Sequence, residues 1–163
     1  MEELDLEFSN GNRARYERIK GGRRGAVLIV PVLDHETVLL IREYAAGTNR
    51  YELGFPKGRI EEGEDILQAA NREIMEETGY GANRLEQLAT FSLAPGYIGS
   101  VTHVVLARDL YKRRLPGDEP EEIEVIPWRM DGMAELLRRE DFSEARSIAA
   151  FYMTRDRLSG GGE

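Results

Sequence analysis

The sequence predicts an α/β fold built as a single domain. The chain has 163 residues, of which 41% are hydrophobic and 8% aromatic, and this suits one core of ordinary size. Short apolar runs bounded by turn residues indicate buried strands, and one segment without glycine or proline repeats its apolar residues at helical spacing. These two signals in one short chain place it in the mixed class.

The N-terminal segment has the pattern of a β-hairpin. Apolar and acidic residues alternate over residues 4–8, turn residues follow at 9–12, and a second extended stretch covers 13–19. We therefore expect residues 1–24 to form a hairpin whose free edge can pair with a second subunit. The main domain is expected at 25–158.

The remaining elements follow from apolar periodicity and from the positions of glycine and proline. Pro56 and Gly58 are expected to interrupt regular structure, Gly79 is expected to end the main helix, and 159–163 is expected to be a flexible tail. Strands are predicted at 26–33, 38–41, 51–55, 85–93, 101–107 and 123–128, and helices at 64–77, 133–139 and 143–157.

Composition excludes several classes of function. The chain has no cysteine and two histidines, which excludes disulfides and thiolate chemistry, fits a cytoplasmic location, and leaves oxygen ligands for any metal ion. The net charge of -8 and pI near 5.0 argue against long nucleic acid as a partner. The longest apolar run is too short to span a membrane, and the acidic residues after Met1 do not fit a secretion signal.

The predicted main helix carries a cluster of carboxylates. Glu73, Glu76 and Glu77 share one helix face because of their spacing, and Glu64 lies near the helix start. Such a cluster repels itself unless a cation lies among its members, and Mg²⁺ prefers carboxylates together with water and phosphate oxygens. The alternative is an ordinary solvated acidic face, which spacing alone does not exclude.

This segment resembles the Nudix box, G-x5-E-x7-R-E-U-x-E-E-x-G-U, where U is an aliphatic or apolar residue. The last position, Tyr80, is bulkier than usual, and Ile74 fills the internal aliphatic position. The other fixed positions are occupied by Gly58, Glu64, Arg72, Glu73, Glu76, Glu77 and Gly79. Resemblance to the Nudix superfamily implies an α/β/α sandwich with a mixed β-sheet, and hydrolysis of a nucleoside diphosphate linked to another group.

The resemblance also implies roles for individual residues. Mg²⁺ or Mn²⁺ is the expected cofactor, with Glu73 and Glu77 as principal ligands, Glu76 as an additional ligand with a catalytic part, and the backbone carbonyl of Lys57 as a further one. Glu64 and Arg72 are expected to orient these ligands.

Features outside the box resemble the ADP-ribose pyrophosphatases within this superfamily. Pro95 stands sixteen residues after Gly79, a spacing associated with those enzymes. They can also use a glutamate on a loop after the last long strand as a base or an extra metal ligand. Here the loop at 117–124 offers Glu119, Glu121 and Glu122, of which Glu119 is the first choice and Glu121 the second; a solvated acidic loop is the alternative.

Substrate contacts are expected along the strands before the box. Ala45 stands where many related enzymes carry an arginine that binds substrate phosphate, so Arg42, Arg50 or Lys57 has to replace it. The remaining candidates are side chains that would stack on adenine or accept a hydrogen bond from it, or that lie in the strand-connecting loop: Tyr44, Tyr51, Glu52, Pro95 and Tyr97.

The resemblance therefore predicts a metal-dependent hydrolase of ADP-linked compounds such as ADP-ribose, diadenosine oligophosphates and NADH, with AMP as a product. A small ADP-containing molecule and a second copy of the chain, in a homodimer, are the expected partners. Two alternatives remain: a Nudix enzyme for another nucleoside diphosphate derivative, and a non-catalytic ADP-ribose sensor. A sensor is expected to lose box glutamates, and this chain keeps all of them.

Overall fold

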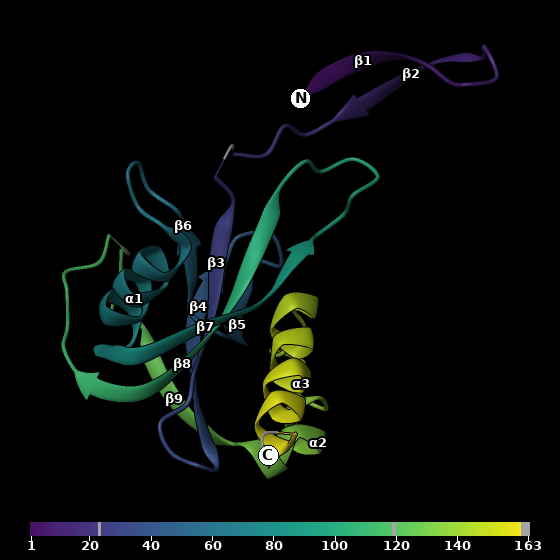
Figure 1. The fold of residues 1–163 in the computed structure, drawn as a ribbon. Helices are drawn as coiled ribbons and strands as arrows, with labels where there is room; N and C mark the ends of the chain where they lie inside the picture. The colour runs from purple at the N-terminus through teal and green to yellow at the C-terminus, as the bar shows by residue number, and fades with distance from the viewer. Residues whose placement is uncertain (23, 119, 161–163) are drawn as a thin grey trace.

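The computed structural model describes residues 1–22, 24–118 and 120–160. Two sheets and three helices form the body, and a hairpin stands apart from it (Figure 1). The first sheet has the order β6-β3-β8-β7, and the second has the order β5-β4-β9. The strands of the first are β3 (Ala26–Pro31), β6 (Lys57–Arg59), β7 (Tyr80–Ser92) and β8 (Val101–Lys112), and those of the second are β4 (Thr37–Ala45), β5 (Arg50–Gly54) and β9 (Glu124–Arg129).

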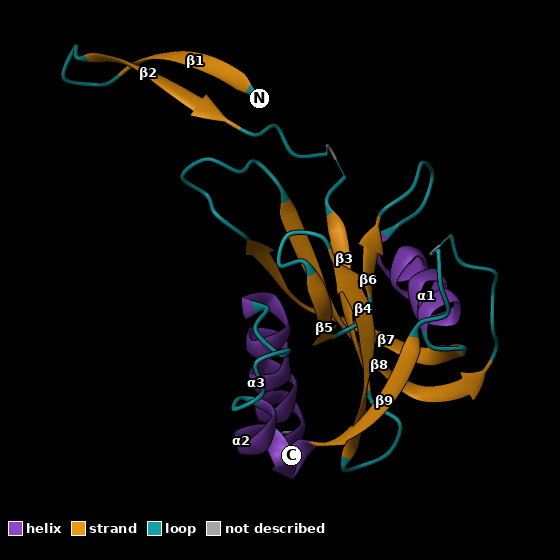
Figure 2. Cartoon of the chain, turned by 180° about the vertical axis from the view of Figure 1, so that it is seen from behind, coloured by secondary structure: helices purple, strands orange, loops and turns teal. Residues whose placement is uncertain are grey.

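The first sheet is mixed. Strand β3 pairs parallel with β8 and antiparallel with β6, and β7 pairs antiparallel with β8. Helix α1 (Ile66–Glu77) lies on one side of the strands, and α3 (Ala145–Ser159) with the short α2 (Met133–Leu136) lies on the other, as the view from behind shows (Figure 2). The layers are therefore helix, sheet and helix.

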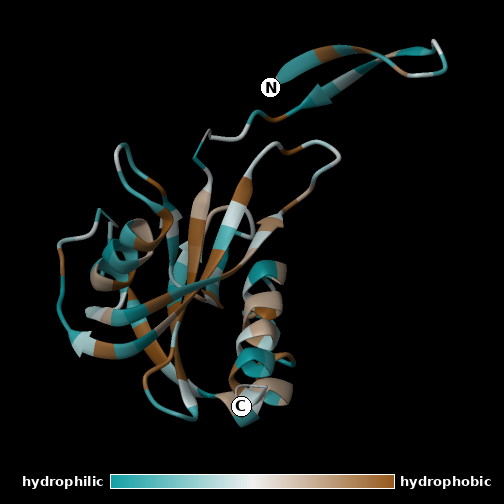
Figure 3. Cartoon of the chain, in the orientation of Figure 1, coloured by the Kyte–Doolittle hydropathy of each residue, from teal (hydrophilic) through white to brown (hydrophobic). Residues whose placement is uncertain are grey.

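The alternation of side chains along β3 builds a core on each face of this sheet. Val27 and Ile29 pack in the cluster that includes Ile74 of α1, while Leu28 packs in the cluster that includes Phe151 of α3. Because both faces are covered, the strand is apolar throughout rather than alternating. Hydrophobic residues accordingly gather in the strands between the two helices (Figure 3).

The hairpin of β1 (Glu2–Glu7) and β2 (Arg13–Arg18) projects away from the body, as Figure 1 shows. Its strands are joined by cross-strand ion pairs, such as Asp5 with Arg15 at 2.9 Å, and every residue of β2 is exposed. The link to the body runs beside the β7–β8 loop, where the Ile19 N–H donates to the Tyr97 carbonyl at 2.7 Å.

Several elements differ from the sequence-based expectations, among them β7, which begins at Tyr80 rather than 85, and β8, which ends at Lys112 rather than 107. Lys57–Arg59 forms β6 despite Pro56 and Gly58, because pairing with β3 provides the backbone partners. Helix α2 ends at Leu136 rather than 139. Helix α3 continues to Ser159, so the predicted tail from 159 was wrong at its first residue; its last three residues, 161–163, lie outside the described residues.

Helix α1 begins slightly later than predicted because Asp65 caps it. The Asp65 side chain accepts a hydrogen bond from the Gln68 N–H at 2.8 Å, and the Gln68 side chain accepts one from the Asp65 N–H at 3.0 Å. This reciprocal capping box fixes the first turn. At the other end Gly79 has φ +76°, a conformation that glycine adopts most readily. Among the described residues, none of the helices is long and apolar enough to cross a membrane.

Ser147 joins α3 to the chain between the two sheets, and this contact gives a first prediction. The buried Ser147 hydroxyl accepts from the Phe55 N–H at 3.1 Å and donates to the Glu144 carboxylate at 2.7 Å. Ser147→Ala leaves a buried N–H without its partner, so urea unfolding is expected to show a loss of about 1–3 kcal/mol with an unchanged m-value. Ser159→Ala at the exposed helix end is the control, and equal stability of both variants would contradict this role.

Candidate active site

Arg72 gathers the carboxylates of the box around one guanidinium. Its nitrogens lie 2.7 and 3.0 Å from the two Glu64 oxygens, and 2.9 Å from oxygens of both Glu73 and Glu76. It also donates to the Arg59 carbonyl at 2.9 Å. Hydrogen bonding to Arg72 lowers the pKa of Glu64, and Glu64 in turn raises the pKa of Arg72. The predicted convergence of acidic residues therefore exists, with a cation already at its centre.

Gly58 is placed so that only a hydrogen fits at its α-carbon. A Cβ built there would lie 2.0 Å from the Glu73 carboxylate. The absence of a side chain lets β6 and the helix face approach closely. Steric exclusion by the Glu73 carboxylate therefore explains why the motif requires glycine at position 58, which the spacing of the motif does not explain.

Glu77 is the most deeply buried acid among the predicted ligands, with 2% of its surface exposed. Its Oε2 atom accepts a hydrogen bond from the Lys57 N–H at 3.1 Å, which brings the Glu77 carboxylate beside the Lys57 main chain. Burial raises the pKa of Glu77 to about 8, and the Lys57 charge opposes this only in part. A buried carboxylate in this state is one that a bound cation would stabilise in its ionised form.

The donor set fits a hard divalent cation. Glu73, Glu76 and Glu77 supply oxygen atoms only, and a main-chain carbonyl is adjacent at Lys57. In the described ranges, however, no three acidic or histidine side chains are already arranged as a metal site. Arg72 occupies Glu73 and Glu76, so a cation would have to compete with this guanidinium for the same oxygens.

The loop after β8 brings a further acid near the box. Glu121 and Glu76 line the same cavity of about 310 Å³, together with Arg114. A hydrogen bond from the Tyr51 hydroxyl to Glu121 raises the pKa of Tyr51. Glu121 is therefore placed between the helix and the strands before the box. Glu119, the first choice from sequence, lies outside the described residues.

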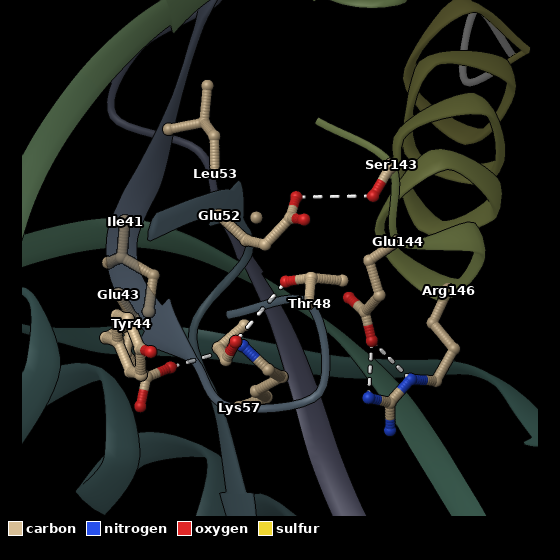
Figure 4. Close-up of a pocket in the computed structure, with 12 residues that line it drawn as sticks. Ile41, Glu43, Tyr44, Thr48, Glu52, Leu53, Lys57, Ser143, Glu144 and Arg146 are labelled. Carbon is tan, nitrogen blue, oxygen red and sulfur yellow. Dashed lines mark hydrogen bonds and ion pairs between the residues drawn. The ribbon is translucent and has the colours of Figure 1, made fainter. Parts of the chain in front are cut away.

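A cleft of about 410 Å³ lies beside the box, between the ends of β4 and β5 and the start of α3 (Figure 4). Of the predicted substrate contacts, Tyr44, Glu52 and Lys57 line it. The Tyr44 ring packs edge-on against Tyr51, with ring centroids 5.5 Å apart. Lys57 Nζ lies 3.4 Å from a Glu43 oxygen, so its charge is partly offset inside the cleft.

Other predicted contacts are not brought to this cleft. Arg42 binds Asp141 at 2.8 Å. Hydrogen bonds from Arg139 and, to a smaller extent, from Arg42 lower the pKa of Asp141 to about 2. Pro95 and Tyr97 lie in the β7–β8 loop beside the hairpin link and line neither the cleft nor the cavity at Glu121.

Arg50, the other arginine considered for phosphate binding, is also engaged elsewhere. It contacts Glu52 at 2.7 Å and the Glu140 carbonyl at 2.6 Å. Of the three cations offered as replacements for the arginine missing at Ala45, Lys57 is the one that lines the cleft.

Arg146 is a cleft residue that sequence reasoning missed. It reaches the cleft from the first turn of α3, paired with Glu144 on the same turn (Figure 4). Its position depends on how α3 packs against the sheets. Helical periodicity in the sequence does not predict which residues this packing brings to the cleft. No signal in the sequence distinguishes Arg146 from the other arginines of the predicted helix.

The chain matches the protein-family model described as the NUDIX domain over residues 22–151. It is 49% identical over 162 residues to the ADP compounds hydrolase NudE of Escherichia coli (strain K12), covering 99% of this chain and 87% of that protein. It is 31% identical over 150 residues to the ADP-ribose pyrophosphatase of Bacillus subtilis (strain 168), covering 90% and 79%. A solved structure described as an ADP compounds hydrolase matches with a TM-score of 0.91 at 49% identity, covering 98% of this chain and 86% of that one.

The chain belongs to the Nudix family. Within that family it is a pyrophosphohydrolase, an enzyme that cleaves phosphoric anhydride bonds. The predicted α/β class, with a mixed sheet and an N-terminal hairpin, is confirmed by the arrangement of strands and by the structural match. Enzymes of this family generally use divalent metal ions.

The raised pKa of Glu77 predicts how stability of the metal-free protein changes with pH. The folded state holds a proton up to about pH 8, while the unfolded chain releases it near pH 4.5, so folding stability falls as pH rises through this window. Glu77→Gln removes this dependence. In chelator, the variant is expected to gain roughly a few kcal/mol over the wild type between pH 5 and pH 9. Parallel stability curves from urea unfolding would contradict the assignment.

Proposed function

We propose that the enzyme hydrolyses the diphosphate of ADP-linked compounds with Mg²⁺, or Mn²⁺, as cofactor and releases AMP. The substrates considered are ADP-ribose, diadenosine oligophosphates and NADH. The observation that carries this proposal is the hydrogen bond from the Lys57 main chain to the buried Glu77 carboxylate, because Lys57 also lines the cleft of about 410 Å³ and so joins the box to it. The relatives named for ADP compounds and ADP-ribose support the choice of substrate class.

The residues divide into those that hold the cation and those that hold the substrate. Glu73 and Glu77, with Glu76 and the Lys57 carbonyl, would hold the metal, while Arg72 and Glu64 orient them. When bound, the cation neutralises charge on the diphosphate and lowers the pKa of a nearby water. The adenosine would enter the cleft, where Tyr44 offers a ring face and Glu52 an acceptor for hydrogen bonds.

The reaction requires a water attack on phosphorus and a base for its proton. Glu121 is our candidate for that base because it shares a cavity with Glu76; Glu119 stays a prediction. The new bond joins the water oxygen to phosphorus, the anhydride P–O bond breaks, and the proton passes to the carboxylate. Lys57 offsets charge on the departing phosphate from the cleft wall.

Loss of a metal ligand gives the direct test. Glu77→Gln is expected to keep the fold and to lower kcat by about a hundred-fold or more, because hydrolysis depends on the bound cation. Glu61→Gln, at a box position where the motif accepts any residue, is the matched control and is expected to stay within about three-fold of wild type. Turnover is measured by product identity over ADP-ribose, diadenosine triphosphate and NADH, with Mg²⁺ present and absent. Unchanged turnover in Glu77→Gln would refute the metal assignment. Failure of the wild type on all three compounds would favour another substrate or a sensor.

We further propose a homodimer in which the hairpin at 1–24 contacts the partner. A two-stranded hairpin alone is marginally stable in water, and this one leaves Leu6, Phe8 and Tyr16 exposed away from the body. Light scattering is expected to give twice the chain mass of 18.5 kDa. Leu6→Asp/Phe8→Asp is expected to shift the mass toward the monomer, and Glu3→Gln serves as control. A wild-type monomer at micromolar concentration would overturn this proposal.

A further inference from the structure

A second cavity, of about 600 Å³, adjoins the cleft and differs from it in charge. Arg24, Arg59 and Arg146 line it from three separate parts of the chain, and the hydroxyl residues Ser100 and Thr102 add hydrogen-bonding groups. The described residues that line it include no acid, whereas the cleft includes three. The chain as a whole carries a net charge of -8. The three arginines around this cavity therefore give it a charge opposite in sign to that of the whole chain.

Arg146 connects the two hollows and is held in place before any ligand binds. It lines both of them. Its Nε and Nη2 atoms contact Glu144, and its Nη1 donates to the Thr102 hydroxyl at 3.1 Å. Glu144 is fixed in turn by the buried Ser147. A guanidinium with this support loses little conformational entropy when it binds an anion.

Arg59 contacts the box through its main chain and lines the second cavity with its side chain. Its carbonyl accepts from Arg72, the residue that gathers the box carboxylates. Along β6, Gly58 faces the Glu73 carboxylate, so the side chains of Lys57 and Arg59 leave the opposite face of the strand. Lys57 lines the cleft and Arg59 lines the second cavity, so β6 supplies one cation to each hollow beside the box.

Arg24 completes the set from the segment before β3. Arg24 forms an ion pair with Glu62 at 3.3 Å, and the Glu62 side chain is 90% exposed. An exposed pair of this kind contributes little and can be exchanged for a stronger anion. Arginine binds phosphate oxygens with two parallel N–H donors, which makes it the preferred residue for this purpose.

We propose that this cavity is a phosphate-binding subsite for a phosphate that the substrate carries beyond the reacting diphosphate, on the side away from adenosine. The inference rests on the proposed function, because it takes the cleft as the adenosine site. A neutral ribose has no use for three guanidinium groups. The subsite therefore favours ADP joined to a further phosphate-bearing moiety over ADP joined to a sugar alone.

Anion binding by the metal-free protein tests the subsite without catalysis. Inorganic tripolyphosphate is titrated calorimetrically at low salt into wild type, Arg24→Gln/Arg59→Gln and Arg84→Gln/Arg155→Gln. The last variant changes net charge equally at exposed positions that line neither hollow. We expect about ten-fold weaker binding in the Arg24/Arg59 variant and a change within about two-fold in the control. Equal weakening in both variants, or in neither, would overturn the subsite.

Substrate preference then distinguishes a substrate phosphate from a free anion. With metal present, kcat/KM is measured for diadenosine triphosphate and for ADP-ribose. We expect the ratio of the first to the second to fall about ten-fold in Arg24→Gln/Arg59→Gln and to stay constant in the control. Weaker tripolyphosphate binding with an unchanged ratio would assign the cavity to a free anion and overturn the substrate role. If the wild type hydrolyses neither compound, the proposed function fails, and the calorimetry alone decides whether the cavity binds phosphate.

Discussion

The arrangement of the active site depends on one guanidinium. Glu64, Glu73 and Glu76 would repel one another on and near a single helix face, and Arg72 contacts all of them within 3.0 Å. Its bond to the Arg59 carbonyl also attaches the helix to β6. The five donors of an arginine make this possible, and a lysine would not reach so many acceptors in one plane. The guanidinium that offsets these carboxylates in the absence of metal is therefore the group with which a metal ion bound there would compete.

Elements specified by nearby residues were the ones that the sequence predicted well. Strand β3 is apolar along its whole length because both faces are covered, and α1 carries its own cap at Asp65 and its own end at Gly79. Strand β6 was missed because its backbone partners belong to β3, about thirty residues earlier. Proline and glycine describe what a segment does alone, and they contain no information on a distant partner that pairs with it.

The same distinction explains which site residues could be predicted. The box residues lie within one short segment, so their spacing alone brings them together on a helix. The cleft is different, because Arg42 and Lys57 were both reasonable phosphate ligands in sequence. Asp141, ninety-nine positions from Arg42, binds that arginine, and of the two cations it is Lys57 that lines the cleft. Arg146 enters from α3 for the same reason: tertiary packing selects it, and no local pattern distinguishes it from other helical arginines.

An acidic protein can attract an anionic substrate when its cations are concentrated where the substrate binds. Net charge governs the distant field, but within a Debye length of roughly 10 Å local groups dominate. Here the acids of the cleft are each offset: Glu43 by Lys57, Glu52 by Arg50 and Glu144 by Arg146. Arg59 and Arg24 then extend the positive charge past the cleft. Arg72 offsets the charges of Glu64, Glu73 and Glu76, while Glu77 accepts from the Lys57 main chain instead. Under the proposed function, a divalent ion at these carboxylates would take over this compensation, and the diphosphate would approach acids whose charge is already offset.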